Sequence, residues 1–188
     1  MAEPRQIRLI MELRAEGVKD PDVLGAIERV AREKFVPDQF ADRAYENTAL
    51  PIGEGQTISQ PLIVGLMTQA LEVGKRMKVL EIGTGCGYQA AVLSQLCRRI
   101  YSIERHKTLL AETTRRLTQL NYTNITTMAG DGSKGWPAQA PFDRIIVTAA
   151  AKDEAPKAFF DQLAPDGILI IPIGSSPIDQ QLWKFRKN

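Results

Sequence analysis

The segment 79–88, which reads VLEIGTGCGY, constrains the fold of this chain more than any other segment. Apolar residues typical of a buried strand lead into a glycine-rich turn, after which a helical pattern begins. Glycine permits backbone conformations that let such a turn approach a nucleotide-like ligand closely. A second apolar run, 100–103, ends in Glu104, 21 residues after Gly83, where a carboxylate can accept hydrogen bonds from ribose hydroxyls. This pattern predicts a βαβ unit that holds an adenosine-containing cofactor.

The spacing of the glycines distinguishes between adenosine cofactors. The dinucleotide fingerprint has glycine at the first, third and sixth positions, whereas Gly83, Gly85 and Gly87 occupy the first, third and fifth. Tyr88 stands at the sixth position, which disfavours a pyrophosphate. Glu81 adds a carboxylate that could meet a cationic group. These features fit S-adenosylmethionine, and E-x-G-x-G-x-G is the first motif of methyltransferases that use it; the alternative is an ordinary glycine-rich strand–helix turn.

The amino-acid composition is typical of one globular domain and argues against nucleic-acid-binding, membrane and metal-binding proteins. The 188 residues are 44% hydrophobic and 24% charged, enough for a sizeable core. A net charge of +2 is too small to indicate nucleic-acid binding. The sequence shows neither a membrane-length apolar run nor a signal-peptide pattern, so we expect a cytoplasmic protein without membrane contact. Cys86 and Cys97 lack the spacing of metal ligands, which predicts free thiols and no metal site.

We expect a single methyltransferase domain with two parts. Residues 1–60 would supply N-terminal helices and a substrate-side loop, and residues 61–188 the cofactor-binding α/β core. Amphipathic patterns predict helices at 4–16 and 22–34. The non-periodic stretch 35–60 predicts a long functional loop, and Pro61 is a favoured start for a helix over 61–73.

From residue 78 onward, strand and helix patterns alternate, which predicts a doubly wound, mostly parallel sheet. Strands are expected near 78–82, 99–103, 124–128, 143–148, 167–173 and 181–186, helices near 87–96, 107–120 and 155–163, and a loop over 132–141. Ligands bind outside the carboxyl ends of such strands. The turns 83–87, 104–106, 130–133 and 148–152 are therefore expected to form the site.

Three further segments carry candidate contacts, each with a plainer alternative. Asp131, between Gly130 and Gly132, could accept a hydrogen bond from an adenine amino group, although Asp-Gly is also common in simple turns. The small residues of 148–151 leave room for a peptide over the methyl group, or merely start a helix. Ser59 in the run GQTISQP (55–61) could cap the helix at Pro61 or contact substrate, and the two roles are compatible.

Taken together, these segments resemble the protein-L-isoaspartate (D-aspartate) O-methyltransferase family over most of the chain. The matching runs are 55–61, 79–91, 102–105, 130–132, 135–136, 141–151, 162–163 and 170–174. The glycine motif is shared by many methyltransferases, whereas the run around Ser59 and the three alanines after Thr148 are much more specific.

The resemblance implies an enzyme that repairs damaged proteins. Such enzymes methylate the free α-carboxylate of L-isoaspartyl residues, and in some members D-aspartyl residues; the ester then closes to a succinimide that can hydrolyse to aspartate. S-adenosylmethionine would be the cofactor and S-adenosylhomocysteine its product. The partners would be isoaspartyl-containing peptides and proteins, acted on by a monomer.

The resemblance also assigns roles to residues. Ser59 would hold the substrate carboxylate as the catalytic residue. The peptide would be bordered by Thr57, Ile58, Ser59, Thr148, Ala149 and Ala150. The cofactor would be held by Glu81, Gly83, Thr84, Gly85, Gly87, Glu104, Arg105, Asp131 and Gly132. Family members usually continue into a final strand beyond the last strand expected here, and an unfilled sheet position favours association.

Two other function classes remain open. A metal-dependent small-molecule O-methyltransferase would need a carboxylate cluster near the fourth strand, for which Asp143, Asp153 and Glu154 are available. Against it, no Asp-Asp or Asp-Asn pair follows that strand. A non-enzymatic S-adenosylmethionine-binding subunit would have no need of the segment around Ser59. Cofactor binding without methyl transfer would distinguish this last class.

Overall fold

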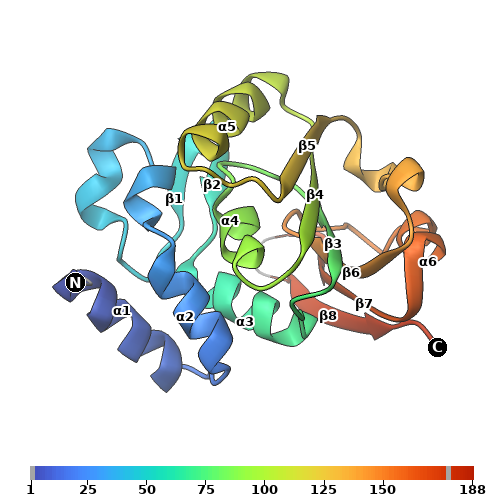
Figure 1. The fold of residues 1–188 in the computed structure, drawn as a ribbon, viewed down its shortest axis with the longest axis horizontal. Coiled ribbons are helices and arrows are strands. Elements are labelled where there is room, and N and C mark those ends of the chain that lie inside the picture. The colour runs from blue at the N-terminus through green and yellow to red at the C-terminus, as the bar shows by residue number, and fades with distance from the viewer. Residues whose placement is uncertain (1–2, 177–178) are drawn as a thin grey trace.

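The computed structural model describes residues 3–176 and 179–188, and within them six strands form one sheet in the order β5-β4-β3-β6-β7-β8 (Figure 1). The strands are β3 (Lys78–Ile82), β4 (Arg99–Glu104), β5 (Ile125–Ala129), β6 (Phe142–Val147), β7 (Leu163–Ile173) and β8 (Gln181–Arg186). Strands β3 to β7 run parallel, and β8 pairs antiparallel with β7. The predicted doubly wound, mostly parallel sheet is therefore confirmed.

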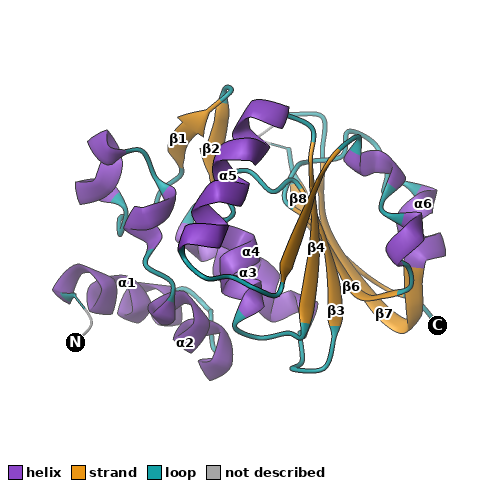
Figure 2. Ribbon diagram, turned by 45° about the horizontal axis from the view of Figure 1, so that its top comes forward, coloured by secondary structure: helices purple, strands orange, loops and turns teal. Residues whose placement is uncertain are grey.

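Helices cover both faces of the sheet, as Figure 2 shows. On one face lie α3 (Pro61–Leu71), α4 (Tyr88–Ser94) and α5 (Lys107–Gln119), and on the other α6 (Lys157–Gln162). Successive side chains of a strand point to opposite faces, so β3 buries Val79 towards α3 and α4 and Leu80 towards α6. This double burial explains why the central strands read as continuous apolar runs.

The N-terminal helices α1 (Pro4–Ala15) and α2 (Pro21–Arg29) pack beside α3 and α4 (Figure 1). Asp20 caps α2 by accepting hydrogen bonds from the backbone N–H groups of residues 22 and 23. The predicted helix over 22–34 is wrong at its end. Val30 is extended, and a separate 3-10 helix, η1 (Arg32–Phe35), follows. The break lets the side chains of Arg32 and Phe35 enter the core, a tertiary effect that periodicity does not report.

The stretch 35–60, predicted as a loop, contains regular structure. A 3-10 helix, η2 (Asp38–Arg43), precedes a hairpin of β1 (Leu50–Gly53) and β2 (Gln56–Ile58). Glu54 and Gly55, at the tip, have φ angles of 50° and 67°, as tight hairpin turns require. The hairpin escaped prediction because its strands are very short and Pro51 argues against a strand.

The remaining element boundaries lie close to those predicted. Strands β3 and β8 begin and end where expected, β7 starts four residues earlier, and α6 is shorter at both ends. Helix α3 stops at Leu71 because Glu72 adopts a left-handed conformation. The expected loop 132–141 holds two 3-10 turns, η3 (Gly132–Lys134) and η4 (Pro137–Gln139). Among the described helices, none combines the length and apolar character needed to cross a membrane.

Candidate active site

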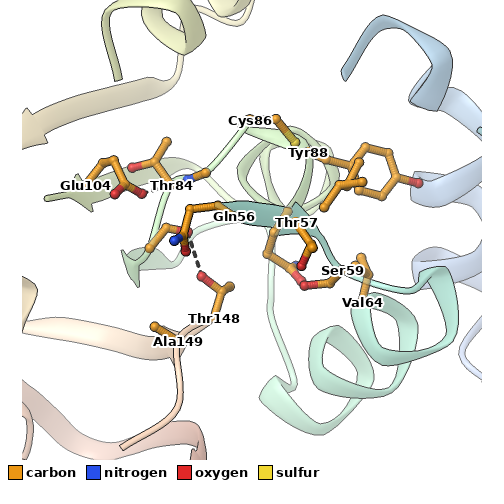
Figure 3. A pocket seen from close by; sticks show the side chains of 14 residues that line it. Gln56, Thr57, Ser59, Val64, Thr84, Cys86, Tyr88, Glu104, Thr148 and Ala149 are labelled. Atoms are coloured by element: carbon orange, nitrogen blue, oxygen red, sulfur yellow. Dashed lines mark hydrogen bonds between the residues drawn. The ribbon is translucent and has the colours of Figure 1, made fainter. Parts of the chain in front are cut away.

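Two adjoining pockets lie at the carboxyl ends of the parallel strands. The hairpin pocket, with a volume of ≈ 80 Å³, is a slot between β2 and the glycine turn after β3, lined by residues that include Gln56–Ser59, Gly83–Cys86, Tyr88 and Thr148 (Figure 3). The sheet pocket, ≈ 500 Å³, is bounded by the ends of β3, β4 and β6 and by the turn at 131–133. Gln56, Gly83, Glu104 and Ala149 line both pockets. The larger has the size of a small-molecule site, and the two meet at the glycine turn.

The turn between β3 and α4 depends on its glycines. Gly83, Gly85 and Gly87 have φ angles of 98°, 53° and 89°, which L side chains rarely adopt. A Cβ on Gly83 would lie 2.4 Å from Thr148 Oγ1, and one on Gly87 would lie 2.9 Å from Thr113 Cγ2. The close packing against Thr148 and Thr113 therefore requires glycine at Gly83 and Gly87, and the backbone at Gly83 and Gly85 lines the hairpin pocket.

Hydroxyl groups from neighbouring elements hold this turn in place. Thr148 Oγ1, just after β6, lies 2.9 Å from the Ile82 carbonyl oxygen and 2.6 Å from that of Gly83, so these two carbonyls share its single hydroxyl proton. Thr113 Oγ1 on α5 donates to the Gly85 carbonyl at 2.6 Å. Sequence reasoning placed Thr148 at the peptide, but its hydroxyl is committed to the turn, which it positions while lining the hairpin pocket.

Glu104, at the end of β4, is the buried carboxylate between the two pockets. Its side chain is 6% exposed. Oε2 accepts a hydrogen bond from Gly85 N at 2.9 Å, and Oε1 accepts one from His106 N at 3.0 Å. Because each carboxylate oxygen has a further acceptor position, Glu104 can still accept two hydroxyl donors. Its location and remaining acceptors suit a ribose diol.

Glu81 lies behind the glycine turn rather than in a pocket wall. It is fully buried, and Oε2 accepts a hydrogen bond of 2.5 Å from Ser102 Oγ, which is 2.7 Å from Thr84 Oγ1. Among the described residues, Glu81 Oε1 has no hydrogen-bond partner. Burial raises the pKa of Glu81 to about 8. Any contact between Glu81 and a cationic ligand would therefore be indirect, through Thr84, which does line the hairpin pocket.

The turn after β5 forms the far wall of the sheet pocket. Asp131 is exposed, and its Oδ1 accepts from Ser133 N at 3.0 Å and from Ser133 Oγ at 2.7 Å, bonds that lower the pKa of Asp131. Asp131 thus makes the local turn expected of Asp-Gly and also faces the pocket with Gly132. Arg105 is exposed at the rim, where its Nε donates to His106 Nε2 at 3.0 Å.

Ser59 lies between β2 and α3 and lines the hairpin pocket with Thr57 and Ile58. The predicted capping role is wrong: the residue at the N-cap of α3 is Gln60, whose own side chain makes no capping bond, and it is Asn47 Oδ1 that accepts a hydrogen bond from Leu62 N in the first turn, at 3.0 Å. In Figure 3 the strand carrying Gln56 and Thr57 leads to Ser59, beside the glycine turn. Sequence reasoning missed Gln56, although it belongs to the singled-out run 55–61, because the hairpin that turns it towards both pockets was not recognised.

The carboxylates that a metal-dependent enzyme would need do not form a cluster at the carboxyl ends of the strands. Asp143 lies at the start of β6, where its Oδ2 accepts a hydrogen bond from Lys78 N at 2.7 Å, at the opposite edge of the sheet. Within residues 3–176 and 179–188, no three His, Cys, Asp or Glu side chains are grouped as a metal would require. Cys86 and Cys97 are buried free thiols, as predicted.

A family model described as Protein-L-isoaspartate(D-aspartate) O-methyltransferase matches residues 4–188 of this chain. The chain belongs to this family. Curated relatives named protein-L-isoaspartate O-methyltransferase include one from Paramagnetospirillum magneticum, which is 66% identical over all of this chain and 87% of its own length. Another, from Rhodospirillum rubrum, is 59% identical over 98% of this chain and 84% of its own length. The membership expected from the sequence is confirmed.

Solved structures of protein-L-isoaspartate O-methyltransferases have the same fold. One of these structures superimposes on this chain with a TM-score of 0.85 at 31% identity. The match covers 97% of this chain and 60% of the solved chain, so this chain spans less than two thirds of the length of the solved chain. A putative family member from Plasmodium falciparum, in complex with S-adenosyl-L-homocysteine, gives a TM-score of 0.84 at 25% identity over 99% and 91% of the two chains.

The residues at the strand ends fit the cofactor of this methyltransferase family, S-adenosylmethionine. A turn that has no room for side chains at Gly83 and Gly87 adjoins a pocket of nucleoside size, Glu104 offers acceptors between the pockets, and the buried Oε1 of Glu81 lacks a partner among the described residues. The turn also lacks the third glycine of a pyrophosphate site, since Tyr88 occupies that position and is buried.

Proposed function

We propose that this chain transfers a methyl group from S-adenosylmethionine to the free α-carboxylate of L-isoaspartyl residues in damaged proteins, with D-aspartyl residues, the acceptors of some family members, as a second candidate acceptor. The observation that carries the proposal is the narrow, hydroxyl-lined hairpin pocket, which meets the larger sheet pocket at Gly83 and Glu104. A peptide carboxylate in the first pocket would face a methyl donor bound in the second.

The cofactor supplies an electrophilic methyl group on a sulfonium. In this proposal Glu104 accepts hydrogen bonds from the ribose hydroxyls, Asp131 and Gly132 border the adenine, and Arg105 covers the rim. The turn with Gly83, Thr84, Gly85 and Gly87 carries the remainder of the molecule on its backbone. Glu81 supports that turn from behind, through Ser102 and Thr84.

The hairpin holds the acceptor. The Ser59 hydroxyl donates a hydrogen bond to one carboxylate oxygen. Thr57 and Ile58 border the peptide on one side, and Thr148, Ala149 and Ala150 border it on the other. A carboxylate has a pKa of about 4 and is already ionised, so no general base is needed. One carboxylate oxygen forms the bond to the methyl carbon as the sulfur–methyl bond breaks, and S-adenosylhomocysteine leaves. Catalysis then comes from in-line positioning.

The proposal extends to the organisation of the protein. We infer one methyltransferase domain, with the acceptor side in residues 1–60 and the cofactor side in residues 61–188, acting as a cytoplasmic monomer without nucleic-acid or membrane partners. The small net charge and the two buried free thiols support this reading.

The decisive test is methyl transfer from labelled S-adenosylmethionine to two peptides that differ only in an isoaspartyl or an aspartyl linkage. We expect a base-labile methyl ester on the isoaspartyl peptide alone. Equal labelling of both peptides, or none on either while S-adenosylhomocysteine binds, would contradict the proposal. The second outcome would favour a binding subunit or a different acceptor.

A further inference from the structure

Arg32 is a fully buried cation outside the pockets described above. It lies in η1, and its guanidinium donates from Nε to the Ala44 carbonyl at 2.9 Å and from Nη2 to the Ser59 carbonyl at 2.8 Å. In the described part of the chain, Nη1 has no hydrogen-bond partner, and no Asp or Glu forms an ion pair with Arg32. An arginine retains its proton even when buried, so this positive charge is not neutralised by the protein.

The guanidinium also touches the opposite wall of the hairpin pocket. Its Cζ lies 4.6 Å from the centre of the Tyr88 ring, a cation–π contact. Tyr88 is the first residue of α4, directly after the glycine turn, and lines the pocket with Ser59. One side chain thus joins the segment that would hold the acceptor to the element that follows the cofactor turn.

Burying a charge without a counter-ion is costly, and the cost falls when an anion binds nearby. Here the charge lies behind Ser59, and the carbonyl that it fixes belongs to a residue that lines the pocket. The arrangement has two consequences for an anionic ligand at Ser59: the guanidinium holds the Ser59 carbonyl, and a positive charge that has no carboxylate partner among the described residues lies on the other side of this residue.

We propose that Arg32 is a positioning residue for the acceptor carboxylate, which fixes Ser59 through its carbonyl and makes the hairpin pocket selective for an anion. This inference rests on the proposed function, because it takes the isoaspartyl α-carboxylate as the occupant. Arg32 does not touch the substrate; it acts through Ser59.

The test compares Arg32→Lys, which keeps the charge, with Arg32→Met, which removes both charge and hydrogen bonds. Loss of a hydrogen bond from a charged group is costly in free energy, so we expect the KM for an isoaspartyl peptide to rise roughly tenfold or more in Arg32→Met. In Arg32→Lys, which keeps the charge, the KM should rise by less. The Kd for S-adenosylhomocysteine should change by less than about twofold, because no cofactor contact is removed.

Arg144→Met is the matched control. Arg144 is also buried and donates to main-chain carbonyls, those of Glu72 and Asp143, but at the amino end of β6. Its replacement should lower stability without changing the peptide KM. A wild-type KM in folded Arg32→Met, or a loss of S-adenosylhomocysteine affinity as large as the rise in peptide KM, would overturn the proposal. If Arg32→Met does not fold, Arg32→Lys decides by the same criteria.

Hydrogen–deuterium exchange separates this proposal from the proposed function. We expect faster amide exchange over residues 56–60 in Arg32→Lys than in the wild type, with no change over the same segment in Arg144→Lys. This readout needs no methyl transfer. If the wild type methylated neither peptide, the proposed function would fail, and unchanged exchange over 56–60 would separately overturn the positioning role.

Discussion

At the scale of single residues, the candidate site is built from side chains held by main-chain groups. Backbone N–H groups hold both oxygens of Glu104, the Thr148 hydroxyl bonds two carbonyls of the glycine turn, and Arg32 bonds the carbonyl of Ser59. Such contacts fix position with little dependence on neighbouring side chains. Single substitutions should therefore separate acceptor binding from cofactor binding.

Ser59→Ala should impair methyl transfer and leave the cofactor site intact. Loss of one hydrogen bond to a carboxylate costs about 1.5–3 kcal/mol, so kcat/KM for an isoaspartyl peptide should fall roughly 10- to 100-fold. Ser94→Ala is the control, since the Ser94 hydroxyl donates to the carbonyl of Ala91 and accepts from the Gln95 side chain near the end of α4, away from both pockets. Unchanged kcat/KM, or weakened S-adenosylhomocysteine binding in calorimetry, would remove Ser59 from the acceptor site.

Glu81 should make the stability of the ligand-free protein depend on pH. Burial raises its folded-state pKa to about 8, whereas in the unfolded chain the pKa is about 4.3. Between these values the unfolded state loses the proton that the folded state keeps, so stability falls as pH rises, by at most about 1.4 kcal/mol per pH unit, and levels off above about 8. Below about 4.3 this contribution is fully present.

Urea unfolding of the wild type and Glu81→Gln at several pH values from 5 to about 8.5 tests this. The amide cannot ionise, so the variant should lack the decline attributed to Glu81. Glu112→Gln, on the exposed side of α5, is the matched control and should retain it. Parallel pH profiles for the wild type and Glu81→Gln would show that the buried carboxyl does not titrate in this range.

At the scale of secondary-structure elements, the site depends on where strands end. The parallel register of β3 with β4 and β6 brings the turns after these strands to one edge of the sheet. The turn positions were predictable because each apolar run that forms a buried strand is followed by glycines or polar residues in the sequence. The hairpin was not predictable, because β1 and β2 are stabilised by pairing with each other. The early end of α2 was not predictable either, because η1 forms when Arg32 and Phe35 are buried in the core.

Gly83→Ala should disrupt the β3–α4 turn. The added Cβ would lie 2.4 Å from Thr148 Oγ1 at a φ of 98°, and a strained backbone of this kind costs about 1–3 kcal/mol. We expect lower stability in urea and weaker S-adenosylhomocysteine binding. Gly74→Ala is the control, because its Cβ would meet only the flexible end of Met77, at 3.5 Å. Equal effects of the two substitutions would show that the turn tolerates a side chain.

At the scale of the whole molecule, the N-terminal helices, the hairpin and the α4 face share one hydrophobic cluster. It includes Leu13 of α1, Ile27 of α2, Ile58 of β2 and Val92 of α4. Two further clusters fill the two faces of the sheet. The acceptor segment is therefore packed against the same core as the cofactor turn, so a ligand at the turn should stabilise the molecule as a unit.

S-adenosylhomocysteine at 100 times its Kd should raise the free energy of unfolding by about 2.7 kcal/mol. For a chain of this size that corresponds to a Tm increase of roughly 5–11 °C in calorimetry. NAD⁺ at the same concentration should give no comparable shift, because Tyr88 replaces the third glycine of a pyrophosphate site. A shift with NAD⁺ but not with S-adenosylhomocysteine would reverse the cofactor assignment.

The sequence by itself determined the family, the parallel sheet and the positions of the turns that line the site, because strand hydrophobicity and glycine placement are local properties. The tertiary structure alone decided what several of those residues contact. Thr148 bonds Gly83 across 65 positions, Arg32 bonds Ser59 across 27, and Glu81 is enclosed with Ser102 rather than exposed to a pocket. These partners are distant along the chain, and only the packing of strands and helices brings them together.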